Sequence, residues 1–397
     1  MSCACARAAW VLAASKILYK NTVMNPKLSD AGDDAEPVFW PSHAPSIPLK
    51  GRGSASWLAH RFAQDAREPF DDGWAPPEPG EVLPLRTEWV WEDCRSAITR
   101  NRSPDIGFDR SVNPYRGCEH GCSYCYARPS HSYLGLSPGL DFETRLIAKR
   151  GLRERLIHEL ASPRYRPGLL AVGTVTDAYQ PLDRELRLTR EVLEVLSDCQ
   201  HPVAIVTKGS GVERDIDLLA GMAQRRLAGV YVSVTTLDAE LARRMEPRAA
   251  APWRRLQTIR RLADAGIPVG VSVSPQIPFI NDDMEQVLEA ARDAGARSAF
   301  YVVLRLPWEL SPLFRQWLQL HYPDRAERVM ARIQDMRGGK DYDASFATRR
   351  SGQGIWAELI AQRFAKACLR LGLNRQKSAP NLADFRPPSR SRQMGLF

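Results

Sequence analysis

The chain has 397 residues, 44% of them hydrophobic, so it can bury one large core with appendages. Its 55 Lys and Arg residues exceed its 46 Asp and Glu residues, and the net charge of +9 favours an anionic partner without saying which. Eight cysteines are too few for a disulfide scaffold, and no apolar run reaches the roughly 18 residues that a membrane span needs. We therefore expect no membrane partner and a reducing compartment, the cytoplasm.

Residues 1–102 read as an irregular N-terminal extension, rich in proline, glycine and charge. Residues 1–19 make a poor secretory signal, because only Arg7 stands before a short apolar patch. We expect the first 25 or so residues to be disordered. The sequence leaves open whether Met1 or Met24 is the initiator.

Two stretches of this extension carry more specific patterns. Residues 50–53, Lys-Gly-Arg-Gly, have a composition that can contact phosphate, although a solvated surface segment is the favoured interpretation. Around residues 86–91 the pattern becomes strand-like, which predicts a segment packed beside the main domain.

Three cysteines, Cys118, Cys122 and Cys125, lie within eight residues, with glycine and aromatic residues among them. Three thiolates suit a soft metal, and a structural zinc site would want a fourth ligand at a matching spacing. His120 and His131 do not form that paired knuckle. A cubic iron–sulfur cluster fits better, because three cysteines leave one iron open to a substrate or cofactor.

After this motif, short valine-rich runs alternate with amphipathic helical patterns. Strands are predicted at 169–175, 203–207, 229–235, 269–274 and 299–304, and helices at 186–196, 216–227, 253–265 and 284–294. With one strand before the cysteines there are six β/α units, which require a parallel sheet. The sequence therefore predicts an α/β fold, a partial TIM-like (β/α)6 barrel whose reactive residues gather after the strands.

Beyond Pro307 the pattern becomes helical, with helices predicted at 313–320, 325–336 and 355–371 inside a helical segment at 311–376. The loop at 337–342 is basic and ends in a tyrosine; contact with nucleic acid and an ordinary exposed turn both remain open. Residues 377–397 are predicted to be a flexible tail.

The motif Cys-x-x-x-Cys-x-aromatic-Cys, after a strand that opens a β/α barrel, resembles the radical SAM superfamily. This resemblance implies a core domain at 103–310 and a [4Fe-4S] cluster on Cys118, Cys122 and Cys125. The open iron would bind S-adenosylmethionine, which is cleaved reductively to methionine and a 5′-deoxyadenosyl radical. It also implies a reductant protein such as flavodoxin or ferredoxin.

The resemblance extends to residues expected to contact S-adenosylmethionine: Tyr124, Thr174, Val175, Thr176, Lys208, Ser233 and Arg248. Tyr124 takes the aromatic place near the adenine, and residues 174–176 take the place of a segment that binds the amino group. Lys208 and Ser233 end strands used for the carboxylate and ribose, although such groups are also common at surfaces. Arg248 could clamp a carboxylate, and an internal salt bridge between Glu246 and Arg248 or a neighbour is the equal alternative.

Within the superfamily, residues 113–126, 173–182 and 277–282 resemble the branch of spore photoproduct lyase and its uncharacterised bacterial relatives. Tyr124 and Tyr126 match the tyrosines that take part in hydrogen return in that lyase, which makes them the candidate catalytic residues. The lyase's cysteine has no match, because no cysteine occurs between residues 125 and 199.

Three functions follow. The first is a radical SAM enzyme of nucleic acid, DNA or RNA, in repair or modification like the photoproduct lyase. The last five residues, Gln393, Met394, Gly395, Leu396 and Phe397, are similar to the motif that binds the bacterial sliding clamp. The second is radical SAM modification of a protein, peptide or small metabolite. The third is a non-enzymatic metal-binding scaffold.

Overall fold

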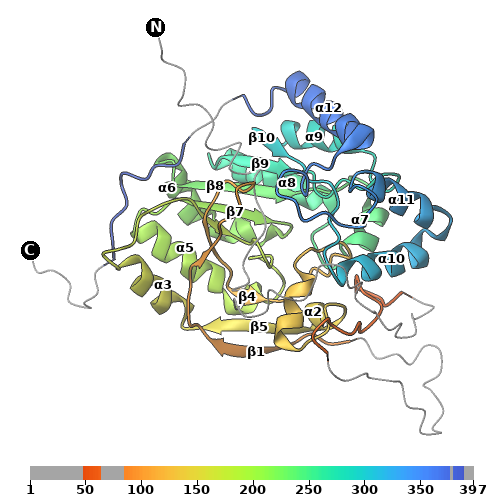
Figure 1. The fold of residues 1–397 in the computed structure, drawn as a ribbon. Helices are drawn as coiled ribbons and strands as arrows, with labels where there is room; N and C mark the ends of the chain where they lie inside the picture. Colours follow the sequence, from red (N-terminus) through yellow and green to blue (C-terminus); the bar gives the residue numbers. More distant parts are fainter. Residues whose placement is uncertain (1–47, 64–84, 376–378, 389–397) are drawn as a thin grey trace, which may run out of the picture.

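The computed structural model describes residues 48–63, 85–375 and 379–388 (Figure 1). The predictions for Met1, Met24, the first 25 residues and the C-terminal pentapeptide at 393–397 lie outside these residues.

A seven-stranded sheet forms the centre of the molecule, in the order β10-β9-β8-β7-β6-β3-β2. Its strands are β2 (Thr99–Arg100), β3 (Arg110–Val112), β6 (Leu170–Val172), β7 (Val203–Thr207), β8 (Ala228–Ser233), β9 (Val269–Ser272) and β10 (Ser298–Phe300). Six of them are parallel and follow chain order, with antiparallel β2 at one edge. Within the described residues the two edges do not pair, so the barrel is partial, as predicted.

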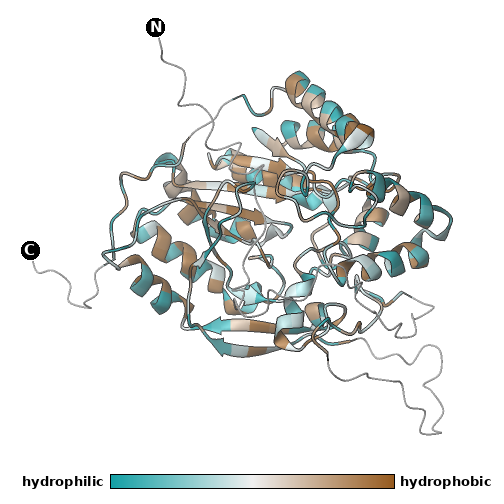
Figure 2. Ribbon diagram, viewed as in Figure 1, coloured by the Kyte–Doolittle hydropathy of each residue, from teal (hydrophilic) through white to brown (hydrophobic). Residues whose placement is uncertain are grey.

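The crossover helices pack their apolar faces on this sheet. They are α3 (Leu152–Leu160), α4 (Asp183–Leu186), α5 (Leu188–Asp198), α6 (Ile216–Gln224), α8 (Pro252–Asp264) and α9 (Met284–Asp293). In Figure 2 the inner strands are largely hydrophobic, whereas the helices carry polar and apolar stretches in turn. In α9, Met284, Val287, Leu288 and Ala291 are buried, which confirms the helical periodicity of the sequence.

A second sheet, in the order β1-β5-β4, was not predicted. It consists of β1 (Glu88–Asp93), β5 (Arg145–Arg150) and β4 (Tyr115–Arg116), with β1 parallel and β4 antiparallel to β5. The strand-like pattern near residues 86–91 is confirmed, but its partner lies over 50 residues away and β4 is too short for periodicity to reveal. Because β1 and β2 come from the extension, residues 85–102 are joined to the core. The domain boundary at 103 stays a prediction.

Three helices follow the barrel, and the first two of them pack beneath the cysteine loop. They are α10 (Leu310–His321), α11 (Pro323–Asp335) and α12 (Gly354–Leu371). Phe314 and Trp317 of α10 belong to the same buried cluster as Cys122 and Tyr124, together with Met245 of α7 (Ala239–Met245). The helical segment therefore completes the environment of the loop. None of the described helices has the length and apolar character to cross a bilayer.

His201 gives the fold a testable pH dependence. Its ring is fully buried, and its Nε2 lies 2.7 Å from the hydroxyl of Tyr165. Burial lowers the pKa of His201 to about 4. Between pH 6.5 and 4 the unfolded chain binds this proton and the folded chain does not, so acidification should remove about 3 kcal/mol of stability.

We expect His201→Gln to flatten the loss of unfolding free energy between pH 7 and pH 4.5, measured by urea denaturation. His158→Gln is the control, because His158 is exposed on α3. If the unfolding free energy of His201→Gln fell with acidification as steeply as that of the wild type, His201 would not be the source of the pH dependence.

Candidate active site

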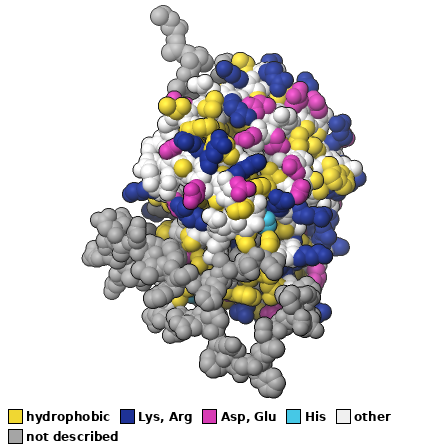
Figure 3. Space-filling view, turned by 90° about the vertical axis from the view of Figure 1, so that its right-hand side faces the viewer, with side chains coloured by type: hydrophobic (Ala, Val, Ile, Leu, Met, Phe, Trp, Pro, Cys, Tyr) yellow, Lys and Arg dark blue, Asp and Glu magenta, His cyan; other side chains and the backbone are white. Residues whose placement is uncertain are grey.

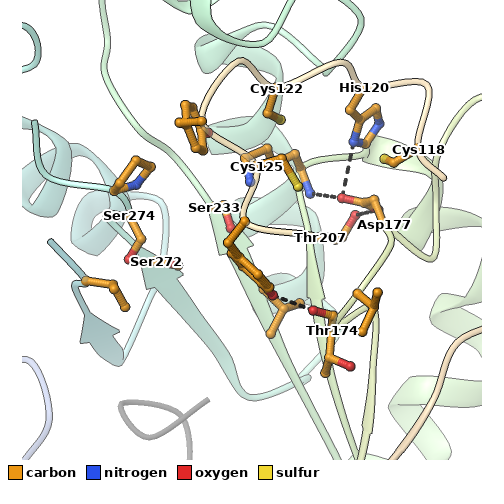
Figure 4. A pocket seen from close by; sticks show the side chains of 18 of the residues that line it. Cys118, His120, Cys122, Cys125, Thr174, Asp177, Thr207, Ser233, Ser272 and Ser274 are labelled. Carbon is orange, nitrogen blue, oxygen red and sulfur yellow. Dashed lines mark hydrogen bonds and ion pairs between the residues drawn. The ribbon is translucent and has the colours of Figure 1, made fainter. Parts of the chain in front are cut away.

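The three cysteines of the loop open into one pocket at the carboxyl ends of the parallel strands (Figure 4). Cys118 and Cys122 are each 7% exposed, and Cys125 is half-buried. The pocket is open to solvent, and the space between its walls together with that open part is about 950 Å³. Every strand of the parallel barrel except β3 contributes residues at or directly after its end, and the loop after β3 supplies the cysteines.

The cysteine loop is held from behind by a buried ion pair. Arg128 Nη2 lies 2.5 Å from Glu143 Oε1, and Arg128 Nε donates to the carbonyl of Cys122 at 2.9 Å. The carboxylate of Glu143 also accepts the backbone N–H groups of Gly53 (3.0 Å) and Ser54 (2.9 Å). These contacts pair the buried charges of Arg128 and Glu143 and fix the backbone carbonyl of Cys122.

In the segment at 50–53 only Lys50 and Gly51 are the exposed surface that the sequence suggested, whereas Arg52 and Gly53 are buried. Arg52 is only 8% exposed and donates to the carbonyl of Glu143 at 3.1 Å. Gly53 lies so close to Gly121 that a Cβ at position 53 would overlap the Gly121 carbonyl oxygen. The prediction failed for these two residues because their partners lie some 70 to 90 residues away in sequence.

The loop after β6 is fixed by Asn113, whose Oδ1 accepts the N–H groups of Thr174 (3.1 Å) and Val175 (3.0 Å). Thr176 donates to the carbonyl of Tyr115 at 3.4 Å. The hydroxyl of Tyr126 donates to the carbonyl of Thr174. All three residues of this segment line the pocket, next to the cysteine loop.

Asp177 ties three parts of the site together. Its Oδ2 lies 3.3 Å from His120 Nδ1 and accepts the N–H of Lys208 at 2.7 Å, while its Oδ1 accepts the hydroxyl of Thr207 at 2.6 Å. Burial raises the pKa of Asp177, but His120 and the hydrogen bonds outweigh it and hold the pKa below its usual range. Asp177 thus links the cysteine loop to the ends of β6 and β7 (Figure 4).

Tyr124 is anchored on a buried carboxylate. Its hydroxyl donates to Glu246 Oε1, which also accepts the hydroxyl of Thr235 at 2.6 Å, and Arg255 pairs with Glu246 Oε2. Burial raises the pKa of Glu246, but the charges of Arg255 and Lys208 lower it by more than that. The pKa therefore lies below its usual value and the carboxylate is ionised. Burial and the Glu246 charge raise the pKa of Tyr124, which stays a neutral donor.

Lys208 and Ser233 line the pocket, as predicted for residues at strand ends, and Lys208 Nζ lies 5.7 Å from the centre of the Tyr124 ring. Arg248 does not belong to the lining. Its guanidinium pairs with Glu119 at 3.0 Å, and Glu246 takes Arg255 as its partner. The expected carboxylate clamp therefore has no support in this geometry, because Arg248 is already engaged beside the cysteine loop.

For the rest of the pocket wall, the strand-end rule indicates Ser274, Pro275 and Arg305 and misses Ser272. All four residues line this wall. Ser274 and Pro275 follow β9 and Arg305 follows β10, whereas Ser272 is the last residue of β9 and is missed because the strand is predicted to continue to residue 274. Ser272 and Ser274 face the cysteine loop across the pocket in Figure 4.

Comparison with known proteins assigns the family. The model of the radical SAM superfamily matches residues 112–293. An uncharacterised protein of Mycobacterium tuberculosis is 35% identical over 241 residues, which cover 59% of this chain and 70% of the relative. The chain belongs to the radical SAM superfamily. The prediction made from the cysteine motif is thereby confirmed.

Other similar proteins are more distant. An uncharacterised protein of Methanocaldococcus jannaschii is 26% identical over 220 residues, covering 55% of this chain and 78% of that protein. Spore photoproduct lyase, solved with bound AdoMet and dinucleoside spore photoproduct, is 14% identical with a TM-score of 0.47. That match covers 71% of this chain and 78% of the lyase chain.

Radical SAM proteins are enzymes that use a [4Fe-4S] cluster and S-adenosylmethionine, so these are the cofactors of this protein. The donor set fits the cluster, since three thiols open into one roomy pocket. In the described part of the chain, no three His, Cys, Asp or Glu side chains converge on a single metal ion. Burial raises the pKa of Cys122 to about 12, so cluster binding must release protons.

Replacing Glu246 by glutamine should test the anchor beneath Tyr124. The change leaves Arg255 as a buried charge without its partner, which we expect to cost about 3 kcal/mol of unfolding free energy. Glu240→Gln is the matched control, because Glu240 pairs with Arg244 at the surface of α7 and such pairs contribute less than about 1 kcal/mol. Equal stability of the two variants in urea denaturation would argue against the anchor.

Proposed function

We propose that Cys118, Cys122 and Cys125 hold the [4Fe-4S] cluster and that the enzyme acts on nucleic acid, in repair or modification. The observation that carries the first part is the opening of all three thiols into one pocket at the strand ends. When bound and reduced, the cluster supplies the electron that cleaves S-adenosylmethionine. The chain's own residues position the cofactors and shield them from water.

We assign the S-adenosylmethionine contacts to pocket residues on either side of the cysteines. The Thr174, Val175 and Thr176 segment is rigid, because Asn113 and Tyr115 bind it. Lys208 can offer its ammonium group to a carboxylate, and Ser233 its hydroxyl to the ribose. Arg248 is left out of this set, because it is bound to Glu119.

The two tyrosines of the loop differ in their contacts. The Tyr124 hydroxyl is committed to Glu246, which favours a role in positioning the loop. The Tyr126 hydroxyl donates to the neutral carbonyl of Thr174, which lines the pocket, and the Tyr126 ring lies 6.0 Å from the guanidinium carbon of Arg305. We therefore keep Tyr126 as the candidate for hydrogen transfer to or from the substrate. Among the described residues that line the pocket, no further cysteine can act as the thiol of a photoproduct lyase.

Nucleic acid is the favoured substrate because of the net charge of +9 and the resemblance to the photoproduct lyase branch. Figure 3 shows basic side chains spread over the face that lies to the right in Figure 1, with acidic ones among them. The described part of that face therefore shows no single-sign patch that would mark a phosphate-binding groove.

The direct experiment is anaerobic reconstitution with iron and sulfide, followed by reduction and measurement of 5′-deoxyadenosine. We expect its formation to rise when single-stranded DNA, duplex DNA or RNA is added. Deuterated substrate should pass deuterium into the 5′-deoxyadenosine. Stimulation by a peptide or small metabolite instead would reject the nucleic-acid substrate, and absence of a four-iron cluster would reject the ligand assignment.

We also propose two protein partners and a cellular location for this enzyme. The pentapeptide Gln393, Met394, Gly395, Leu396 and Phe397 is proposed to bind the sliding clamp, and its deletion should abolish clamp affinity in a direct binding assay. A flavodoxin or ferredoxin is proposed as reductant. The cytoplasm is proposed as location, because its reducing conditions keep cluster thiols available.

A further inference from the structure

The turn at residues 246–251, between α7 and α8, is joined to the cysteine loop. The N–H of Arg248 donates to the carbonyl of His120 at 3.3 Å. The carboxylate of Glu246 accepts the hydroxyl of Tyr124. His120 and Tyr124 stand on either side of the middle cysteine in the sequence. The turn therefore contacts the loop next to a proposed ligand of the cluster.

One buried guanidinium fixes the geometry of this turn. Arg255 of α8 pairs with Glu246 at the start of the turn, and its Nε donates to the carbonyl of Ala250 near the end at 2.6 Å. Its Nη1 donates to the carbonyl of Ser233, the last residue of β8, at 3.1 Å. The turn is therefore held between the cysteine loop and the barrel at both of its ends.

The turn covers a side of the cysteine loop that the pocket does not reach. The three cysteines line the pocket together with His120 and Tyr124, but among the described lining residues none belongs to the turn. Residues 247–250 of the turn are partly exposed and Ala251 is exposed. The turn is thus bound to the loop on one side and faces solvent on the other.

The helix that follows the turn presents an unusual side chain to solvent. Trp253, the second residue of α8, is 65% exposed, which makes it the most exposed aromatic side chain of the described residues. Gln257 and Arg260 follow at helical spacing and are also exposed, so they share its face of α8. The Cα atom of Trp253 lies five residues from that of Arg248, hence at most about 18 Å away. Tryptophan and arginine are the residues most enriched at the centres of protein interfaces.

The charge around the turn is strongly positive. Between Arg243 and Arg261 the chain holds seven arginines and a single acidic residue, Glu246. Within the described residues, four carboxylates pair with these arginines: Glu240 with Arg244, Glu119 with Arg248, Glu246 with Arg255, and Glu213 with both Arg254 and Arg261. The seven positive charges exceed these four negative ones, so the surface attracts an acidic partner.

The proposed chemistry requires an electron to reach the cluster from outside the protein. The pocket admits S-adenosylmethionine and the substrate, which leaves the other sides of the cysteine loop for electron entry. Tunnelling between proteins weakens steeply with distance, so the donor must dock close to the loop. A partner seated on the turn is separated from the loop by a single chain segment. Complexes of electron-transfer proteins have small interfaces, and complementary charges steer their formation.

We infer that the turn at 246–251 and the face of α8 with Trp253 and Arg260 form the docking surface for the reductant, an acidic electron-transfer protein. The inference rests on the proposed function and names the surface that its reductant uses. One electron passes from the partner's reduced flavin or iron–sulfur centre, which is oxidised, to the bound cluster, which is reduced. No covalent bond forms or breaks in this step.

The first test measures binding of an acidic, oxidised flavodoxin to the full-length reconstituted protein by calorimetry at several salt concentrations. We expect Trp253→Ala to raise the Kd by about tenfold or more. Arg260→Gln should raise it by about threefold and make binding less dependent on salt. Trp91→Ala is the matched control, because Trp91 of β1 is 40% exposed, and Arg370→Gln is the control for an exposed arginine. Both controls should bind flavodoxin as the wild type does.

The second test compares two reductants. Dithionite is a small molecule that needs no docking surface, so Trp253→Ala should form 5′-deoxyadenosine with dithionite at the wild-type rate. With reduced flavodoxin, the same variant should show a KM for flavodoxin raised about tenfold and an unchanged kcat. Circular dichroism verifies that each variant is folded.

Four results would overturn the inference. They are equal flavodoxin affinity of Trp253→Ala and Trp91→Ala, an equal loss of activity with both reductants, and no binding of either flavodoxin or a ferredoxin to the wild type. The fourth is a Trp253-dependent affinity for single-stranded DNA with flavodoxin binding unchanged, which would assign the surface to nucleic acid. If the wild type with dithionite cleaved no S-adenosylmethionine, the proposed function would fail instead, and the binding measurement, which needs no turnover, would still decide on the surface.

Discussion

Replacing Cys122 by serine is expected to abolish cleavage of S-adenosylmethionine while the barrel stays folded. Loss of outer-shell partners of a metal site alone typically costs 10- to 100-fold, so loss of a proposed ligand should cost more than about 100-fold. The side chain belongs to a buried cluster with Tyr124 and Phe314, but its change removes no large volume. Iron and sulfide content, 5′-deoxyadenosine formation and circular dichroism are the measurements.

The control for this experiment is Cys94→Ser, because Cys94 is a half-buried thiol outside the pocket. It should leave iron content and 5′-deoxyadenosine formation unchanged. If Cys122→Ser kept a full four-iron cluster, the ligand assignment would fail. If it lost secondary structure together with iron, the metal would be structural.

Gly53→Ala is the second change for which we expect a large effect, although the residue lies far from the cysteines in sequence. A Cβ at this position overlaps the carbonyl oxygen of Gly121, and both backbones are held by the carboxylate of Glu143 or lie against it. Relief requires a shift of the cysteine loop, so we expect a loss of about 3 kcal/mol in unfolding free energy. The reconstituted variant should also lose iron faster on gel filtration.

Gly51→Ala is the matched control in the same segment. Gly51 is exposed with no atom near its would-be Cβ, although its φ of 75° makes alanine cost about 1 kcal/mol. Equal stability and equal iron retention in the two variants would show that residues 52–54 do not support the cysteine loop.

Together these variants separate the chemistry of the site from its support. Cys122 is proposed to supply a ligand, whereas Gly53, Arg128 and Glu143 fix the backbone that carries it. Both kinds of change should lower activity, but only the second should also lower the stability of the cluster-free protein substantially.

Local sequence was sufficient for the barrel and for the family. Valine-rich runs and helical periodicity placed β7 and α9 within one or two residues, because secondary structure follows a short-range pattern. The spacing of Cys118, Cys122 and Cys125 indicated the cluster motif, since a few neighbouring residues define a loop around a metal centre. Lys208 and Ser233 followed from the rule that strand ends face the site.

The tertiary structure decided which charged groups pair. Glu246 stands two residues from Arg248, yet it pairs with Arg255, because α8 turns that guanidinium into the buried site. Arg305 meets Tyr342 only through the packing of the loop on α10 and α11. Which charged groups pair over tens of residues depends on burial and on the geometry of the whole fold. Short-range sequence patterns therefore do not predict these pairs.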